Sequence, residues 1–86
     1  MEEAEVYLQL TQIFRDVFMR DDLELRPTLT AKDVPGWDSF KQIEIILGVE
    51  QKYKIKFHTR DLDGLRNVGD LARTVLVKTS GKATSP

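Results

Sequence analysis

The sequence contains no cysteine and only one histidine among its 86 residues. Without cysteine the chain cannot form a disulfide framework or a thiolate metal site. A single histidine also leaves too few ligands and general bases for most zinc sites and most nucleophile–base pairs. That histidine, His58, lies in a predicted connector with no implied catalytic partner. These absences disfavour metalloenzymes and cysteine hydrolases. We predict a protein that is not an enzyme and has neither catalytic nor metal-binding residues.

Long apolar runs and an excess of one charge are also absent. No apolar stretch approaches the roughly 18 residues of a membrane-spanning helix, and the acidic start at residues 1–5 is unlike a secretory signal. Thirteen basic and fourteen acidic side chains give a formal net charge of -1, so no electrostatic field favours nucleic acid or an anionic membrane. We expect a soluble, cytoplasmic monomer that binds neither.

The composition fits one small globular domain. Hydrophobic residues make up 41% of the chain and charged residues 31%. A domain of this size buries only about 60–65% of its unfolded surface, which argues against a deep polar catalytic cleft. We predict a single domain over residues 1–78. Residues 79–86 are rich in small polar residues without apolar periodicity and predict a disordered C-terminal tail.

Helical periodicity is the main structural signal. Apolar residues recur at three- and four-residue intervals over residues 3–19, the pattern of an amphipathic helix. After a long loop, Asp38 is a good N-cap for a helix over residues 39–53. Thr59 or Asp61 can open a short third helix that ends near Arg66, and Asn67 is an N-cap for a fourth. The sequence therefore predicts an all-α four-helix bundle with a long first connection and a short third helix.

The helix over residues 39–53 is predicted to begin at Ser39, directly after the long loop. Free backbone N–H groups and the positive end of the helix dipole favour a phosphate there. Asp38 can cap the helix and can also help to hold Mg²⁺ during phosphoryl transfer to the serine. Taken alone, these two residues fit a plain capping pair better. The same helix has an unusually wide apolar surface, which lines a pocket, meets a partner, or packs on two sides.

Four stretches of the sequence closely resemble the acyl carrier protein family. They are G-W-D-S-F at residues 36–40, I-E-I-I-L at residues 43–47, E-Q-K-Y-K-I-K-F at residues 50–57 and N-V-G-D-L at residues 67–71. The resemblance covers about residues 5–77 and matches the order and spacing of all four predicted helices. It implies a four-helix bundle of the acyl-carrier-protein type.

The resemblance also implies a cofactor and partners. In that family the serine matched by Ser39 accepts 4'-phosphopantetheine from coenzyme A through a Mg²⁺-dependent phosphopantetheinyl transferase, and Asp38 matches the preceding aspartate. The thiol of the arm carries an acyl or aminoacyl group as a thioester between acyl-loading and acyl-accepting enzymes. Trp37, just before the motif, anchors the loop to the core or contacts the arm or a partner.

The second helix is the main docking surface of such carriers. This makes five positions candidate partner contacts, although each is equally an ordinary solvated position: Lys41, Glu44, Leu47, Gly48 and Gln51.

Three departures from the family pattern bear on the pathway. Phe40 replaces the usual leucine after the serine, and Lys41 and Lys52 stand on a helix that is commonly acidic in carriers of fatty acid synthesis. Partners that recognise an acidic helix should bind this chain weakly. We therefore expect a specialised carrier of a lipid, polyketide or secondary-metabolite pathway.

Two alternatives from other classes remain at this stage. The first is an unmodified helical protein-interaction module that keeps the carrier fold and binds a partner through the second helix. The second is a helix-turn-helix nucleic-acid binder, which the absence of a basic helix face disfavours.

Overall fold

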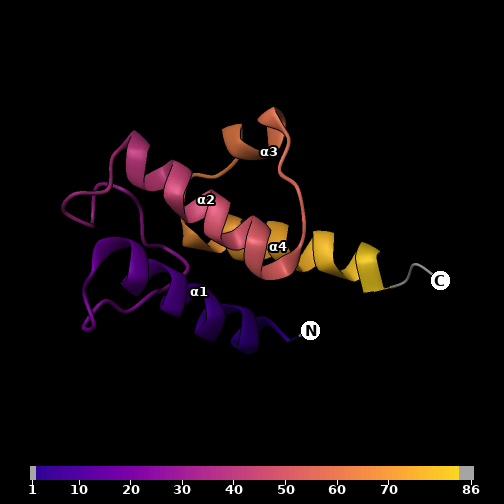
Figure 1. Cartoon of the computed structure of the whole chain (residues 1–86), viewed down its shortest axis with the longest axis horizontal. Coiled ribbons are helices and arrows are strands. Elements are labelled where there is room, and N and C mark those ends of the chain that lie inside the picture. The colour runs from indigo at the N-terminus through magenta and orange to yellow at the C-terminus, as the bar shows by residue number, and fades with distance from the viewer. Residues whose placement is uncertain (1, 84–86) are drawn as a thin grey trace.

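The computed structural model describes residues 2–83 and contains four helices (Figure 1). They are α1 at Glu3–Phe18, α2 at Ser39–Tyr53, α3 at Thr59–Asp63 and α4 at Val68–Ala83. The described part of the chain has no strand, and none of its helices is long and apolar enough to cross a membrane. The predicted all-α fold with four helices is confirmed.

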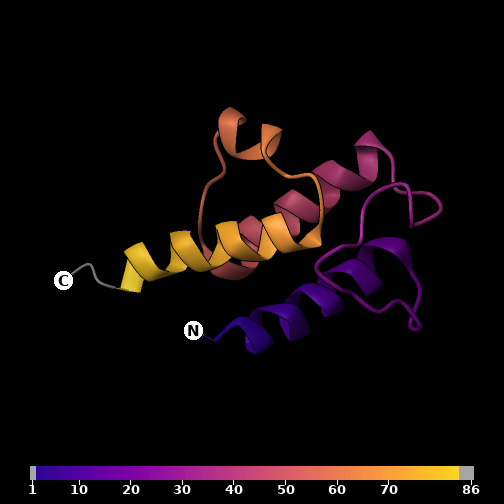
Figure 2. The same cartoon turned by 180° about the vertical axis from the view of Figure 1, so that it is seen from behind.

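The three long helices supply most of the core, and α1 packs against both α2 and α4 (Figure 2). Their apolar stripes face inward, as the three- and four-residue spacing predicts. Phe14 of α1, Ile45 of α2 and Val75 of α4 are fully buried. The remaining buried side chains of these helices are Val6, Leu10, Ile46, Val49, Tyr53, Val68, Leu71 and Ala72.

The long loop between α1 and α2 is pinned to the core rather than free. Leu23, Leu29 and Val34 are buried along it. The Arg15 Nε of α1 donates a hydrogen bond to the Leu23 carbonyl at 2.8 Å. The loop therefore reaches the start of α2 along a defined path.

The same loop closes the N-terminus of α4. The Val68 N–H donates to the Leu29 carbonyl at 2.9 Å, and the Gly69 N–H donates to the Pro27 carbonyl at 3.0 Å. The Asn67 side-chain oxygen accepts the N–H of Asp70, the next residue of the helix, at 2.8 Å. A Cβ on Gly69 would lie 3.0 Å from the Pro27 oxygen, a tight contact, so this close approach favours glycine.

Helix α3 is shorter than the sequence predicts. It ends before Gly64 and not near Arg66. The Asp61 carboxylate accepts the His58 N–H at 2.8 Å and so caps the helix. It also forms an ion pair with Lys78 of α4, with Nζ and Oδ2 3.0 Å apart. No residue of α3 is buried. The helix therefore depends on its cap and on polar contacts more than on apolar packing.

Helix α4 is longer than the sequence predicts. It continues to Ala83, so the prediction of a disordered tail from residue 79 is wrong for residues 79–83. The Thr79 hydroxyl donates to the Val75 carbonyl, four residues earlier in the helix, at 2.8 Å. No proline interrupts this segment. The rest of the predicted tail, residues 84–86, lies outside the described residues.

Candidate functional site

Ser39 is the first residue of α2, and its side chain is exposed. Asp38 is the N-cap, as predicted: its Oδ1 accepts the Lys41 N–H at 3.0 Å, and its carbonyl accepts the Gln42 N–H at 2.9 Å. The first turn contains no acidic residue. The N–H groups of Ser39 and Phe40 precede the first helical hydrogen bonds and can bind a phosphate at the positive end of the helix dipole.

Trp37 holds the segment just before the N-cap in place. Gly36, at φ +88°, makes the turn, and the Trp37 N–H donates to the Val34 carbonyl at 3.2 Å. The indole meets the ring of Phe14 edge to face, with centroids 5.3 Å apart, and lies 6.1 Å from the ring of Phe18. The interpretation of Trp37 as the anchor of the loop is confirmed.

A hollow beside the exposed serine, here called the Ser39 hollow, opens between the loop, α2 and α3. Its lining includes Trp37, Asp38, Ser39, Ile43, Leu62 and Leu65. It adjoins a groove between α2 and α3 of about 310 Å³, here called the α2–α3 groove. That groove is lined mainly by Ile43, Ile46, Leu47, Phe57 and Leu62. A mostly apolar surface thus leads away from Ser39 along α2.

The outward face of α2 is also apolar. Phe40, Ile43 and Leu47 are 76%, 57% and 51% exposed and follow one another along the helix. Part of the wide apolar surface that the sequence shows therefore lines the groove, and part faces solvent. Packing on two sides does not account for it.

The five candidate partner contacts do not share one environment. Leu47 is exposed on the apolar face, and Glu44 and Gln51 are exposed beside it. The Lys41 Nζ donates to the Val17 carbonyl at 3.2 Å and lies 3.8 Å from a Glu44 carboxylate oxygen. Gly48 packs on α1, where an added Cβ would lie 3.1 Å from a side-chain carbon. The structure thus groups Glu44, Leu47 and Gln51 outward and turns Lys41 and Gly48 towards α1.

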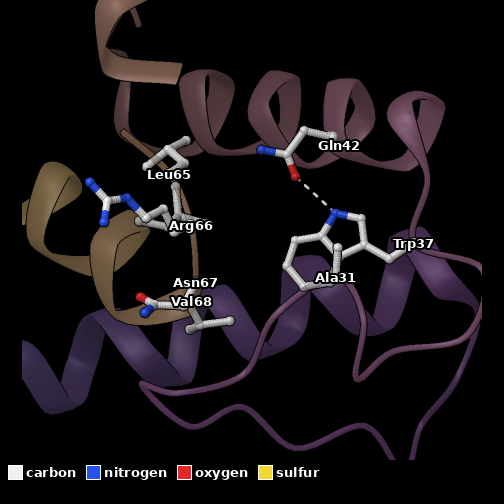
Figure 3. Close-up of a pocket in the computed structure, with 8 residues that line it drawn as sticks. Ala31, Trp37, Gln42, Leu65, Arg66, Asn67 and Val68 are labelled. Carbon is white, nitrogen blue, oxygen red and sulfur yellow. Dashed lines mark hydrogen bonds between the residues drawn. The ribbon is translucent and has the colours of Figure 1, made fainter. Parts of the chain in front are cut away.

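Sequence reasoning missed Gln42, which lies one turn after Ser39. Its Oε1 accepts the Trp37 Nε1–H at 2.8 Å (Figure 3). Its side chain borders both the Ser39 hollow and the α2–α3 groove. The available signal was a polar residue on the side of the helix that otherwise carries Ile45, Ile46 and Val49.

The site has the features that a phosphopantetheine group needs. It combines an exposed hydroxyl at a helix N-terminus, a first turn without acidic residues and an adjoining apolar hollow. No three acidic, histidine or cysteine side chains of residues 2–83 come together to hold a metal ion.

Known proteins match this chain in sequence and in fold. Residues 9–75 match the family model described as the phosphopantetheine attachment site. The meromycolate extension acyl carrier protein of Mycolicibacterium aurum is 33% identical over 69 residues, which cover 80% of this chain and 71% of that protein. The acyl carrier protein of Rhodococcus erythropolis is also 33% identical over 69 residues, or 80% of this chain and 76% of that protein.

A solved structure extends the match to nearly the whole chain. The solution structure of a holo acyl carrier protein from Geobacter metallireducens has a TM-score of 0.89 and 40% identity, covering 94% of this chain and 93% of that chain. Family model, relatives and fold agree. The chain belongs to the phosphopantetheine-attachment family as an acyl carrier protein, which carries acyl groups on a covalent phosphopantetheine arm.

Proposed function

We propose that Ser39 is the residue that carries the phosphopantetheine arm and that this chain presents acyl thioesters to partner enzymes without catalysing a reaction itself. The observation that carries the proposal is the exposed Ser39 hydroxyl at the first position of α2, beside an apolar hollow. The neighbouring N–H groups are placed to bind the phosphodiester.

Loading requires a phosphopantetheinyl transferase. The Ser39 oxygen forms a bond to the phosphorus that carries pantetheine in coenzyme A, the bond from that phosphorus to the adenosine bisphosphate breaks, and the hydroxyl proton passes to a base of the transferase. One Asp38 oxygen is used by the helix cap, which leaves the other to help bind Mg²⁺ with ligands from the transferase.

The outward face of α2 supports a specialised lipid pathway as the setting. Enzymes that recognise an acidic helix gain little from this face, where Glu44 is the acidic residue and Lys41 lies beside it. The relatives named for meromycolate extension support the same setting. In this proposal Glu44, Leu47 and Gln51 contact the acyl-loading and acyl-accepting enzymes, and Phe40 and Ile43 join them.

Intact-mass spectrometry tests the attachment residue directly. After incubation with coenzyme A, Mg²⁺ and a phosphopantetheinyl transferase, we expect the chain to gain about 340 Da. Ser39→Ala should gain nothing, whereas Thr28→Ala, which removes an exposed hydroxyl from the loop, should be modified normally. Modification that persists in Ser39→Ala would assign the arm to another residue. Failure with several transferases would favour the unmodified interaction module.

A further inference from the structure

Gln42 stands where three hollows near the start of α2 meet. The first two are the Ser39 hollow and the α2–α3 groove, and the third is a smaller pocket of about 50 Å³ between Trp37, Leu65 and Leu71 (Figure 3). Among the described residues, Gln42 is the one side chain that lines all three. A group that leaves Ser39 along any of these paths passes Gln42.

The hydrogen bond from Trp37 fixes the orientation of the Gln42 amide. The indole Nε1–H is a donor without acceptor capacity, so the amide oxygen must face it, at 2.8 Å. Figure 3 accordingly shows the amide nitrogen pointing away from the indole. The indole in turn is held by the rings of Phe14 and Phe18. Both N–H groups of the Gln42 amide are thus presented in a set direction, beside mostly apolar walls.

An oriented N–H donor in a mostly apolar hollow suits a chain that is largely apolar but carries carbonyl groups. Pantetheine has two amide carbonyls, and a loaded arm adds a thioester carbonyl. The other polar residue of the α2–α3 groove fits less well: Glu50 already accepts the Phe57 N–H at 2.8 Å, and a carboxylate cannot donate to a carbonyl.

We propose that the Gln42 amide binds the phosphopantetheine arm by donating a hydrogen bond to one of its carbonyl oxygens, and that Trp37 is the positioning residue for this contact. The inference rests on the proposed attachment at Ser39. It assigns to Gln42 the role of holding the arm, and its cargo, against α2 when no enzyme is bound.

Three variants separate the parts of this contact. Gln42→Glu keeps an acceptor for the Trp37 N–H but removes both donors from the hollow. Trp37→Phe keeps the amide donors but removes the group that orients them. Gln12→Glu is the matched control, because it makes the same chemical change at an exposed position of α1 away from the three hollows.

The experiment compares apo and holo chains by nuclear magnetic resonance, with ¹³C in the arm carbonyls and ¹⁵N in the protein. In the unaltered chain and in Gln12→Glu, attachment should shift the Gln42 side-chain N–H resonances and give cross-peaks between them and the arm. In Gln42→Glu the arm carbonyl shifts should move towards those of free pantetheine. The ratio of bound to free arm should fall about five-fold, the effect of one neutral hydrogen bond. Trp37→Phe should give an intermediate loss.

Intact mass measured on each sample keeps the two proposals apart. A chain that acquires no arm contradicts the proposed function. A chain that carries the arm at Ser39 while its Gln42 resonances and arm carbonyl shifts match those of the apo chain and free pantetheine overturns this inference alone. An equal change in Gln12→Glu and Gln42→Glu would also overturn it, because it would assign the effect to the added charge.

Discussion

The three long helices and α3 are held in different ways. The long helices bury apolar side chains, among them Phe14 and Ile45, which have no exposed surface. Helix α3 buries no residue, and its Asp61 carboxylate forms an ion pair with Lys78 of α4, at 3.0 Å. The Lys78 Nζ also lies 5.7 Å from the centroid of the Phe57 ring.

This difference bears on the site, because α3 contributes Leu62 to both the Ser39 hollow and the α2–α3 groove. One wall of the candidate site therefore belongs to the element with the least apolar anchoring. Regions with few buried contacts open at lower free energy than the core. We expect α3 to open and close while the long helices stay packed.

Phe14→Ala should have the largest effect, because it removes a fully buried ring and the edge-to-face partner of Trp37. We expect the free energy of unfolding to fall by about 3–5 kcal/mol, measured by chemical denaturation. The matched change in the weakly held element, Leu62→Ala, should cost less than about 1 kcal/mol, because that side chain is 40% exposed. Equal losses for the two variants would contradict the comparison.

Gly69→Ala should have the next largest effect. Its Cβ would press on the Pro27 oxygen at 3.0 Å, where the loop closes α4. We expect a loss of about 1–3 kcal/mol in the free energy of unfolding. Gly64→Ala is the control at the end of α3: its nearest neighbours lie 3.7 and 3.8 Å from the added Cβ, in ordinary contact. A Gly64→Ala loss as large as that of Gly69→Ala would mean that α3 is packed as tightly as the core.

Lys78→Met should loosen α3 selectively. The change keeps an apolar stem of similar length and removes the charge that pairs with Asp61. Amide hydrogen exchange should become faster in α3, while exchange in the cores of α1, α2 and α4 stays nearly unchanged. Lys56→Met, which removes an exposed charge from the connector before α3, should leave both rates as they are. Faster exchange throughout the chain would show that the ion pair serves the whole fold.

Low pH should weaken the same ion pair between Asp61 and Lys78. We expect this effect to be the smallest of the four that are predicted here. The His58 N–H, and after it Lys78, lower the pKa of the Asp61 carboxyl below its usual value. Because the lowered pKa belongs to the folded protein, the contribution is complete above the usual pKa of about 3.9 and is lost as the pH falls through the folded value. Amide resonances of α3 should therefore follow a titration step whose midpoint lies below the usual carboxyl value. In Asp61→Asn this low-pH step should be missing; if it persists, another group causes it.

Most of the fold could be predicted from local patterns. The spacing of apolar residues located the three long helices, and Asp38 marked the start of α2. The ends of α3 and α4 were missed because tertiary contacts determine where these helices stop and the sequence has no strong stop signal there. Gly81 is tolerated inside the last turns of α4, whereas composition alone favoured a disordered tail at that point.

The candidate site was less accessible to sequence reasoning. The sequence made Lys41 and Gly48 candidate partner contacts on α2, but spacing cannot say that both residues face α1. The hydrogen bond between Trp37 and Gln42 joins a loop residue to a helix residue, and helical periodicity does not place the loop residue. Helical periodicity describes contacts within one helix. A contact between a loop residue and a helix residue can be identified only when the path of the loop is known.

The N-terminus of α4 has a consequence for how the chain folds. Two of its first N–H groups are satisfied by carbonyls of Pro27 and Leu29, about forty positions earlier in the sequence. In an isolated peptide with the α4 sequence these two N–H groups would have only water as a partner. The loop and the start of α4 therefore stabilise each other in the folded chain, although they are far apart in the sequence.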